Sequence, residues 1–247
     1  MVTYCQEGSE NVLVTNRLQS AQSIAPVWTL IRNGLIVSCQ APKGTPIDDP
    51  SFIRAQALTV ELAGAAAIRA EGILNVRAVC ASVKVPVIGL VKAYSDESDV
   101  YITPRAQDVI DLEKAGASIV AIDATQRTRW GGQSLEEFYK EVKQHTNIQL
   151  MADIDCIENA QFAANLGFDA VATTLHGYTD QPSQPLPNLN LVGAVSKVLD
   201  IPIIAEGGFT TPLDVKQAIT NGAWSVCVGT AITNPYVLTK QFVNGAF

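Results

Sequence analysis

The chain has 247 residues, of which 47% are hydrophobic and 17% charged, and its formal net charge is −7 at pH 7. This apolar content excludes a disordered chain, and an acidic balance without a basic run argues against a nucleic-acid surface. No apolar stretch reaches the roughly 18 residues that cross a bilayer, and no secretory leader begins the sequence. Five widely spaced cysteines without a C-x-x-C pair indicate reduced thiols and neither a disulfide framework nor a zinc site. We therefore expect a cytoplasmic protein with no membrane or nucleic-acid partner.

Residues 1–33 precede any repeating pattern and are predicted to form an extension, with one helix from Asn16 to Arg32 that caps the far end of the domain. Residues 34–247 are predicted to form a single α/β domain. Eight short apolar, β-branched runs alternate there with helix-like stretches, which is typical of a (β/α)8 TIM barrel. The expected strands are Leu35 to Cys39, Ala65 to Ile68, Val87 to Val91, Ile119 to Ile122, Gln149 to Ala152, Ala170 to Thr173, Ile203 to Ala205 and Ser225 to Val228.

A repeated glycine supports the same architecture. Gly64, Gly116, Gly167 and Gly222 each follow a helix-like stretch and precede an expected strand, at intervals of 52, 51 and 55 residues. Each interval holds two strand-helix units, so these glycines are predicted to end helices in the left-handed conformation.

Helix starts carry their own signals. Thr103-Pro104 and Thr211-Pro212 each predict a threonine N-cap followed by proline in the first turn, and Ser134 with Glu137 predicts a capping box. The turns into strands are short, whereas several turns out of strands are long and polar. In barrels of this kind the elaborated, carboxyl-end rim holds the chemistry.

Polar residues occur where the apolar runs stop, and barrel closure would bring them to one mouth. They are Gln40, Arg69, Lys92, Asp123, Asp153, Thr174, His176 and Glu206. Lys92 directly follows an apolar strand, so partial desolvation is expected to lower its pKa and make it a general base or a Schiff-base amine. Glu206 is its predicted partner. Gly207, Gly208, Gly229 and Thr230 follow the last two strands, where barrels often bind phosphate on backbone amides.

Each of these residues also has a structural interpretation. Lys92 could neutralise the acidic stretch from Asp96 to Asp99, and Asp123 and Asp153 could cap the following helices. The glycines could be plain turn residues. Two distant histidines, His145 and His176, make a metal centre improbable.

Nine segments, in order from Gly34 to the C-terminus, resemble those of N-acetylmannosamine-6-phosphate 2-epimerases. They are GLIVSCQ ending at Gln40, AAIR at Arg69, VIGLVK at Lys92, YITP at Pro104, IDAT at Thr125, MAD at Asp153, TTLHGYT at Thr179, AEG at Gly207 and VGTAIT at Thr233.

The resemblance implies interconversion of N-acetylmannosamine 6-phosphate and N-acetylglucosamine 6-phosphate, a step in the use of sialic acid, with no metal or other cofactor. It places the family's catalytic lysine and glutamate at Lys92 and Glu206, and its substrate contacts at Gln40, Arg69 and Asp153. Our hypothesis is that Lys92 moves the C2 proton while Glu206 positions Lys92. The resemblance also implies a homodimer.

The sequence departs from the family pattern at two positions, where Gly208 and Asn234 replace arginines that could pair with phosphate. An unphosphorylated acylhexosamine therefore remains an alternative substrate. Two other functions stay open: a lyase in which Lys92 forms an imine with a keto acid, and a non-catalytic sugar-phosphate sensor.

Overall fold

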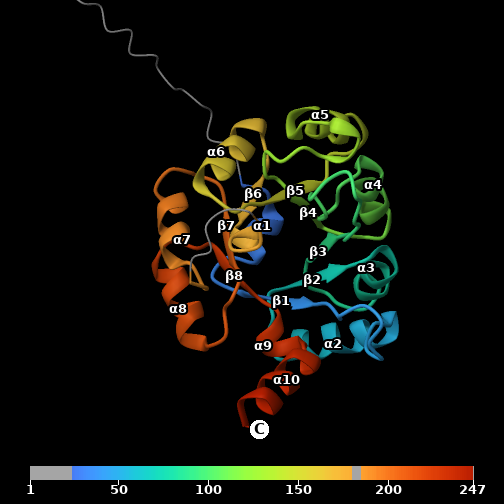
Figure 1. Cartoon of the computed structure of the whole chain (residues 1–247), viewed down its shortest axis with the longest axis vertical. Helices are drawn as coiled ribbons and strands as arrows, with labels where there is room; N and C mark the ends of the chain where they lie inside the picture. The colour runs from blue at the N-terminus through green and yellow to red at the C-terminus, as the bar shows by residue number, and fades with distance from the viewer. Residues whose placement is uncertain (1–23, 180–184, 247) are drawn as a thin grey trace, which may run out of the picture.

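The computed structural model describes residues 24–179 and 185–246, and its eight strands form one closed parallel barrel in the order β1 to β8. Figure 1 shows the helices arranged around these strands. The predicted barrel is confirmed. The strands are β1 Leu35–Cys39, β2 Ala67–Glu71, β3 Val87–Leu90, β4 Ile119–Asp123, β5 Gln149–Asp153, β6 Ala170–Ala172, β7 Ile203–Glu206 and β8 Ser225–Val228.

Helices follow the strands around the barrel (Figure 1). The α-helices are α1 Pro26–Leu30, α2 Pro50–Leu62, α3 Ile73–Cys80, α4 Ala106–Lys114, α5 Leu135–His145, α6 Ile157–Leu166, α7 Leu189–Ser196, α8 Pro212–Thr220, α9 Thr230–Thr233 and α10 Pro235–Ala246, and two short 3₁₀ helices are η1 Trp130–Gly132 and η2 Thr173–Leu175. None of the helices in the described part of the chain is both long and apolar enough to span a bilayer.

The four repeated glycines adopt the predicted conformation, with φ of 99° at Gly64, 101° at Gly116, 106° at Gly167 and 100° at Gly222. A residue with a side chain is strained at such φ values. The turn at Gly64 also explains why β2 begins two residues later than predicted. The Ala65 amide donates back to Val60 at the end of α2, so Ala65 belongs to the turn.

Two of the three predicted helix starts are confirmed. Ser134 and Thr211 cap α5 and α8 and form capping boxes with the third residue of each helix. The prediction at Thr103 is wrong, because α4 begins at Ala106 after Arg105. The Thr103 hydroxyl donates instead to the Ala121 carbonyl of β4, and Thr103 has a φ of 46°.

Alternate residues of each strand face the inside of the barrel. Ile36, Ala67, Ile88, Ala121 and Ile204 belong to one inner cluster, together with Met151, Ala170 and Cys227. Their neighbours along the strands, such as Val37, Ile68 and Val120, pack in a second cluster with residues of the surrounding helices. Both faces of the sheet are thus covered, as expected for parallel strands.

The amino end of the barrel is covered by α1. Trp28 is buried against the inner cluster, and its indole Nε1 donates to the Gln149 side chain at the start of β5, at 2.7 Å. The Trp224 indole in turn donates to the Trp28 carbonyl. Residues 16–23 of the helix predicted from Asn16 to Arg32 lie outside the described residues, and the described part is helical from Pro26 to Leu30. The extension over residues 1–33 stays a prediction.

Candidate active site

The mouth at the carboxyl ends of the strands is lined by polar side chains. They continue the inward-facing rows, because side chains two apart on a strand share a face. Arg69 follows Ala67, Lys92 follows Leu90, and Glu206 follows Ile204 in this way. The polar side chains that continue these rows include Ser38, Gln40, Arg69, Glu71, Lys92, Asp123, Asp153, Thr174 and Glu206.

Arg69 is the centre of this set. It lies within β2, one register step deeper than predicted, and its side chain is 1% exposed. Its guanidinium donates to both oxygens of Asp153, with Nη1–Oδ1 at 3.1 Å and Nη2–Oδ2 at 2.6 Å, and Nη1 also donates to Glu206 Oε2 at 2.7 Å. The Thr174 hydroxyl donates to Asp153 Oδ1 at 2.7 Å. Three strands, β2, β5 and β7, and the 3₁₀ helix η2 after β6 are therefore tied together around one buried cation.

Burial shapes the charge of these groups. Desolvation works against the charge of Arg69, but Asp153 and Glu206 outweigh it and raise the pKa of Arg69 above its ordinary value. Burial raises the pKa of Glu206, while the charge of Arg69 lowers it in part. The Arg69 Nε atom is buried without a partner among the described residues.

Lys92 has no ion pair or hydrogen bond from its Nζ within the described residues, unlike Arg69 and the two carboxylates that it binds. It is half-buried, just beyond β3, and desolvation lowers its pKa below 10.5. A lowered pKa increases the neutral fraction, which is the form that accepts a proton. The stretch from Asp96 to Asp99 forms no ion pair with Lys92, which removes support for a purely neutralising role.

Glu206 does not pair directly with Lys92, contrary to the expected arrangement. Its carboxylate is held by Arg69, and its charge raises the pKa of Lys92 less than that of Glu71 does. The largest raising influence on the pKa of Lys92 is Glu71, at the end of β2 and next to Leu90 in the register. Sequence reasoning missed Glu71. The two-residue period on from Arg69 would have placed it on the same inner face.

Asp123 and Asp153 do not cap helices, since α5 and α6 begin after Ser134 and Cys156. Asp123 is fully buried and accepts from Arg127 Nη2 at 2.7 Å and from the Thr125 hydroxyl at 2.7 Å. Burial raises the pKa of Asp123 and the charge of Arg127 opposes that shift. Arg127 is a second residue of the rim that sequence reasoning did not identify.

The remaining predicted substrate contacts differ in how many of their polar atoms are already engaged in hydrogen bonds within the protein. Gln40 donates to the Ser38 hydroxyl at 2.8 Å and leaves its carbonyl without a partner among the described residues. His176 has both ring nitrogens in use, because Nδ1 donates to the Asp155 carbonyl and Nε2 accepts from Asn188, each at 2.8 Å. His176 therefore connects the end of β6 to the segment before α7.

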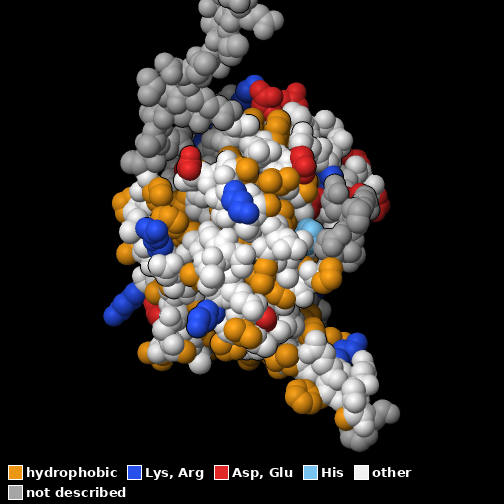
Figure 2. All heavy atoms as spheres, turned by 90° about the vertical axis from the view of Figure 1, so that its left-hand side faces the viewer, with side chains coloured by type: hydrophobic (Ala, Val, Ile, Leu, Met, Phe, Trp, Pro, Cys, Tyr) orange, Lys and Arg blue, Asp and Glu red, His pale blue; other side chains and the backbone are white. Residues whose placement is uncertain are grey.

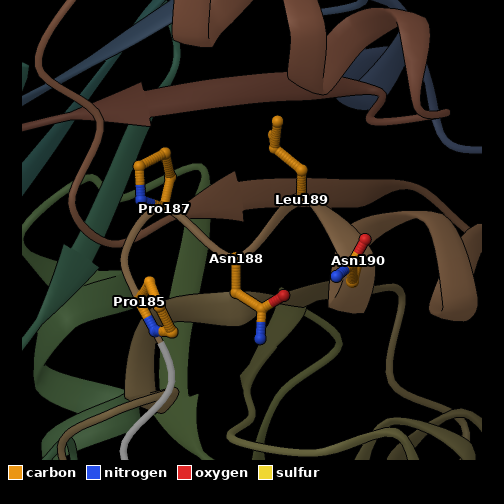
Figure 3. Close-up of a pocket in the computed structure, with 5 residues that line it drawn as sticks. All are labelled: Pro185, Pro187, Asn188, Leu189 and Asn190. Atoms are coloured by element: carbon orange, nitrogen blue, oxygen red, sulfur yellow. The ribbon is translucent and has the colours of Figure 1, made fainter.

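That segment lines a hollow formed by Pro185, Pro187, Asn188, Leu189 and Asn190. Figure 3 shows that the Asn188 side chain points away from that of Leu189. The Asn188 amide bonds to His176 and its carbonyl accepts from the Leu191 amide at the start of α7. The residues that line this hollow share no hydrogen bond with Arg69, Asp153 or Glu206 in the described part of the chain.

The glycine loops lie after β7 and β8, as predicted. Gly207 and Gly208 have φ values of 111° and 74°, and Leu186 packs over both. A Cβ at Gly208 would lie 2.4 Å from that of Leu186, which explains why no side chain stands there. Thr230 begins α9 after Gly229, and the Asn234 side chain accepts from the Val237 amide in α10. Asn234 thus serves as a helix cap.

Metal-binding side chains are not clustered in the residues that the structure describes: no group of three or more His, Cys, Asp and Glu is placed to hold an ion. Arg69, Asp153 and Glu206 are instead engaged with one another.

A closed parallel barrel with a desolvated amine and buried carboxylates at its carboxyl-end mouth defines a (β/α)8-barrel enzyme. The sequence profile of the NanE family, described as "Putative N-acetylmannosamine-6-phosphate epimerase", matches residues 53–246. The chain belongs to this family.

Individual relatives agree with the profile. A protein from Caldanaerobacter subterraneus subsp. tengcongensis, named "Putative N-acetylmannosamine-6-phosphate 2-epimerase", is 43% identical over 215 residues, covering 86% of this chain and 91% of its own. A protein of the same name from Thermosynechococcus vestitus is 41% identical over 216 residues, covering 87% and 94%. The solved N-acetylmannosamine-6-phosphate 2-epimerase from Clostridium perfringens superposes with a TM-score of 0.84 at 35% identity, covering 89% of this chain and 96% of that one.

Proposed function

We propose that the protein interconverts N-acetyl-D-mannosamine 6-phosphate and N-acetyl-D-glucosamine 6-phosphate by removing and returning the proton at C2. The family and the full-length relatives support the reaction. The single observation that carries the proposal is Lys92, an amine at the mouth whose pKa is lowered by burial and which has no ion pair among the described residues.

The open-chain sugar carries an aldehyde at C1, which makes the C2 proton acidic. Neutral Lys92 takes this proton, the electron pair of the C2–H bond forms a C1–C2 double bond, the π pair of the carbonyl moves to the C1 oxygen, and an enolate forms. Return of the proton to the opposite face of C2 inverts that carbon and regenerates the aldehyde. Arg69, kept cationic by Asp153 and Glu206, stabilises the developing negative charge electrostatically.

Glu206 acts in this proposal through Arg69. The Glu206 carboxylate, 2.7 Å from the guanidinium, fixes the orientation of Arg69, and Glu206 and Asp153 together balance the positive charge of Arg69. Gln40 and Thr174 lie on the same inner face and supply polar groups for the sugar hydroxyls. His176, with both nitrogens engaged, contributes by holding the rim after β6 in place.

The phosphate is proposed to bind at the carboxyl ends of β7 and β8, on Gly207, Gly208, Gly229 and Thr230. Leu186 over Gly208 leaves no room for an arginine there, and Asn234 is committed to α10. Backbone amides would therefore carry most of the binding. Turnover of N-acetylmannosamine with and without the phosphate tests whether the phosphate is required.

The working assembly is proposed to be a cytoplasmic homodimer. The four described cysteines are free thiols, which fits a reducing compartment. Figures 1 and 2 show α10 projecting from the body of the molecule, and its Tyr236, Phe242 and Val243 are exposed. An apolar helix of this kind is typical of a surface that a second chain covers.

Proton exchange at C2 tests the proposed function directly. We expect the wild-type protein, in heavy water with N-acetylmannosamine 6-phosphate, to incorporate deuterium at C2 as epimerisation proceeds, observed by NMR. Lys92→Ala should lower exchange by at least about a hundredfold, the scale of a lost general base. Lys140→Ala, which changes an exposed lysine paired with Glu136, should leave the rate unchanged.

The result that contradicts the proposal is wild-type exchange in Lys92→Ala, or none in the wild type. Trapping of a covalent adduct on Lys92 by borohydride with a keto acid would favour the lyase. Saturable binding of the sugar phosphate without exchange would favour the sensor.

A further inference from the structure

The loop after β3 folds back over the mouth and brings Tyr101 next to Lys92. Lys92 and Ile102 form an antiparallel bridge, and the Ala93 amide donates to the Tyr101 carbonyl at 3.0 Å. The Tyr101 ring packs against the inward-facing cluster of the barrel. Tyr94 stacks on it, with the ring centroids 5.5 Å apart and the planes at 11°. Tyr101 is thus a fixed wall of the mouth on the β3 and β4 side.

The Tyr101 hydroxyl is available to a ligand. It has no hydrogen-bond partner among residues 24–179 and 185–246, yet it is not sealed off from solvent. Burial of the half-buried ring, with Asp153 and Asp123 nearby, raises the pKa of Tyr101 to about 12. The hydroxyl is therefore protonated at neutral pH and is able to donate a hydrogen bond.

Arg127 offers a second free donor on the same side. Its Nε donates to the Thr125 hydroxyl at 3.0 Å and its Nη2 to Asp123 at 2.7 Å, which fixes the plane of the guanidinium. The Nη1 atom has no partner within the described part of the chain, and the side chain is 23% exposed. One edge of the guanidinium is thus anchored, and Arg127 lies near enough to Tyr101 for its charge to act on the phenol, lowering the pKa of Tyr101 against the effect of burial.

We propose that the Tyr101 hydroxyl and Arg127 Nη1 bind the carbonyl oxygen of the acylamino group at C2 of the substrate. This assignment rests on the proposed function, which places C2 at Lys92 and the phosphate at β7 and β8. The nitrogen on C2 then lies beside Lys92, and Tyr101 is the wall adjacent to Lys92 on the side away from the phosphate.

The chemistry of the two donors selects an acylated amine. A carbonyl oxygen only accepts hydrogen bonds, and two donors, one of them cationic, match it. A free amino group is protonated at neutral pH, would be repelled by Arg127 and cannot accept from Tyr101. The pair would therefore determine specificity for acylated over free 2-amino sugars.

The test compares two unreactive open-chain inhibitors, glucitol 6-phosphate and 2-acetamido-2-deoxyglucitol 6-phosphate, whose reduced C1 prevents enolate formation. The measured quantity is the ratio of their inhibition constants in the C2 exchange assay. Wild-type protein should bind the acetamido compound more tightly than glucitol 6-phosphate. We expect Tyr101→Phe and Arg127→Lys each to reduce this preference about tenfold, the scale of one hydrogen bond to a charged or buried group. The inhibition constant of glucitol 6-phosphate should hardly change.

Tyr101→Phe is the decisive variant, because the lost hydroxyl has no hydrogen-bond partner among the described residues. Arg127→Lys keeps a positive charge beside Asp123 but loses the donors on the free edge of the guanidinium. Arg105→Lys, at an arginine paired with Asp108 on α4, and Tyr236→Phe on α10 are the matched controls and should keep the wild-type ratio. An unchanged ratio in Tyr101→Phe, or an equal loss for both inhibitors, overturns the assignment. Absence of exchange in the wild type would instead overturn the proposed function.

Discussion

At the scale of single residues, the electrostatic setting of Lys92 governs how the proposed reaction depends on pH. Burial lowers the pKa of Lys92, while Glu71 opposes burial more than any other group. The charge of Arg69 also lowers the pKa of Lys92, and the charges of Glu206 and Asp153 raise it less than Glu71 does. The net effect of these influences is a lowered pKa, so a larger fraction of Lys92 is neutral than in an exposed lysine. A general base must be neutral in this way to accept a proton.

The second-order rate constant kcat/KM should therefore rise with pH as Lys92 loses its proton, with an inflection below 10.5. Glu71→Gln removes the carboxylate that most favours the protonated amine, so we expect the inflection to move to lower pH. Glu97→Gln, at an exposed carboxylate in the same loop as Tyr94, is the control and should leave the inflection in place. Profiles that coincide for wild type and Glu71→Gln would show that Glu71 does not act on Lys92.

At the scale of elements, the glycine turns set where each even strand enters the barrel. Gly167 ends α6 with a φ of 106°, and its carbonyl accepts from the Tyr139 hydroxyl at 2.9 Å. A Cβ at this position would lie 2.7 Å from that hydroxyl. Both the backbone conformation and the packing against α5 therefore require glycine.

Gly167→Ala should lower the free energy of unfolding by about 2 kcal/mol, the cost of a left-handed residue with a side chain. Gly193→Ala is the matched control, because Gly193 lies inside α7 and its added Cβ would meet only Asn221, at an ordinary 3.5 Å. This second change should leave stability equal or raise it by up to about 1 kcal/mol. Equal losses in the two variants, measured by urea unfolding, would contradict the turn argument.

At the scale of the whole molecule, the barrel separates its stabilising end from its reactive end. α1 covers the amino end, where Trp28 is 1% exposed and bonded to Gln149 and Trp224. The polar mouth lies at the other end of the same strands. Such a division is general in these barrels, whose loops at the carboxyl end vary without disturbing the rest.

Trp28→Phe should therefore lower stability without altering catalysis. Loss of the indole hydrogen bond and of packed volume should cost about 2 kcal/mol and lower Tm by several degrees for a chain of this size. At temperatures where the variant is folded, KM and the C2 exchange rate should match those of the wild type. A changed KM in the folded variant would show that the two ends are coupled.

The inference from sequence was strongest where a local period or turn decides the structure. The eight strands, the four entry glycines and two of three helix caps follow from neighbours in the chain. Thr103 was mispredicted because its hydroxyl prefers a carbonyl of β4, eighteen residues away, to the amides of its own helix. Such a preference depends on packing that no local pattern contains.

The polar residues at the strand ends were likewise visible in the sequence, because barrel closure must bring them to one rim. Their pairing was not. Arg69 takes Asp153 and Glu206 from strands 84 and 137 residues away, and Glu71, not Glu206, acts most strongly on Lys92. Distances between charged groups from different strands decide these partners, and the order of residues carries no such distances.

The barrel, the end at which its chemistry lies and the residue types available there can all be predicted from the order of residues, since each follows from a period of two or from a turn. That Leu186 fills the space over Gly208 and that Tyr101 folds back beside Lys92 becomes known only in the folded molecule. Both result from loops packing on strands that are remote in the chain. Excluded volume and desolvation at such contacts arise only once the barrel is closed.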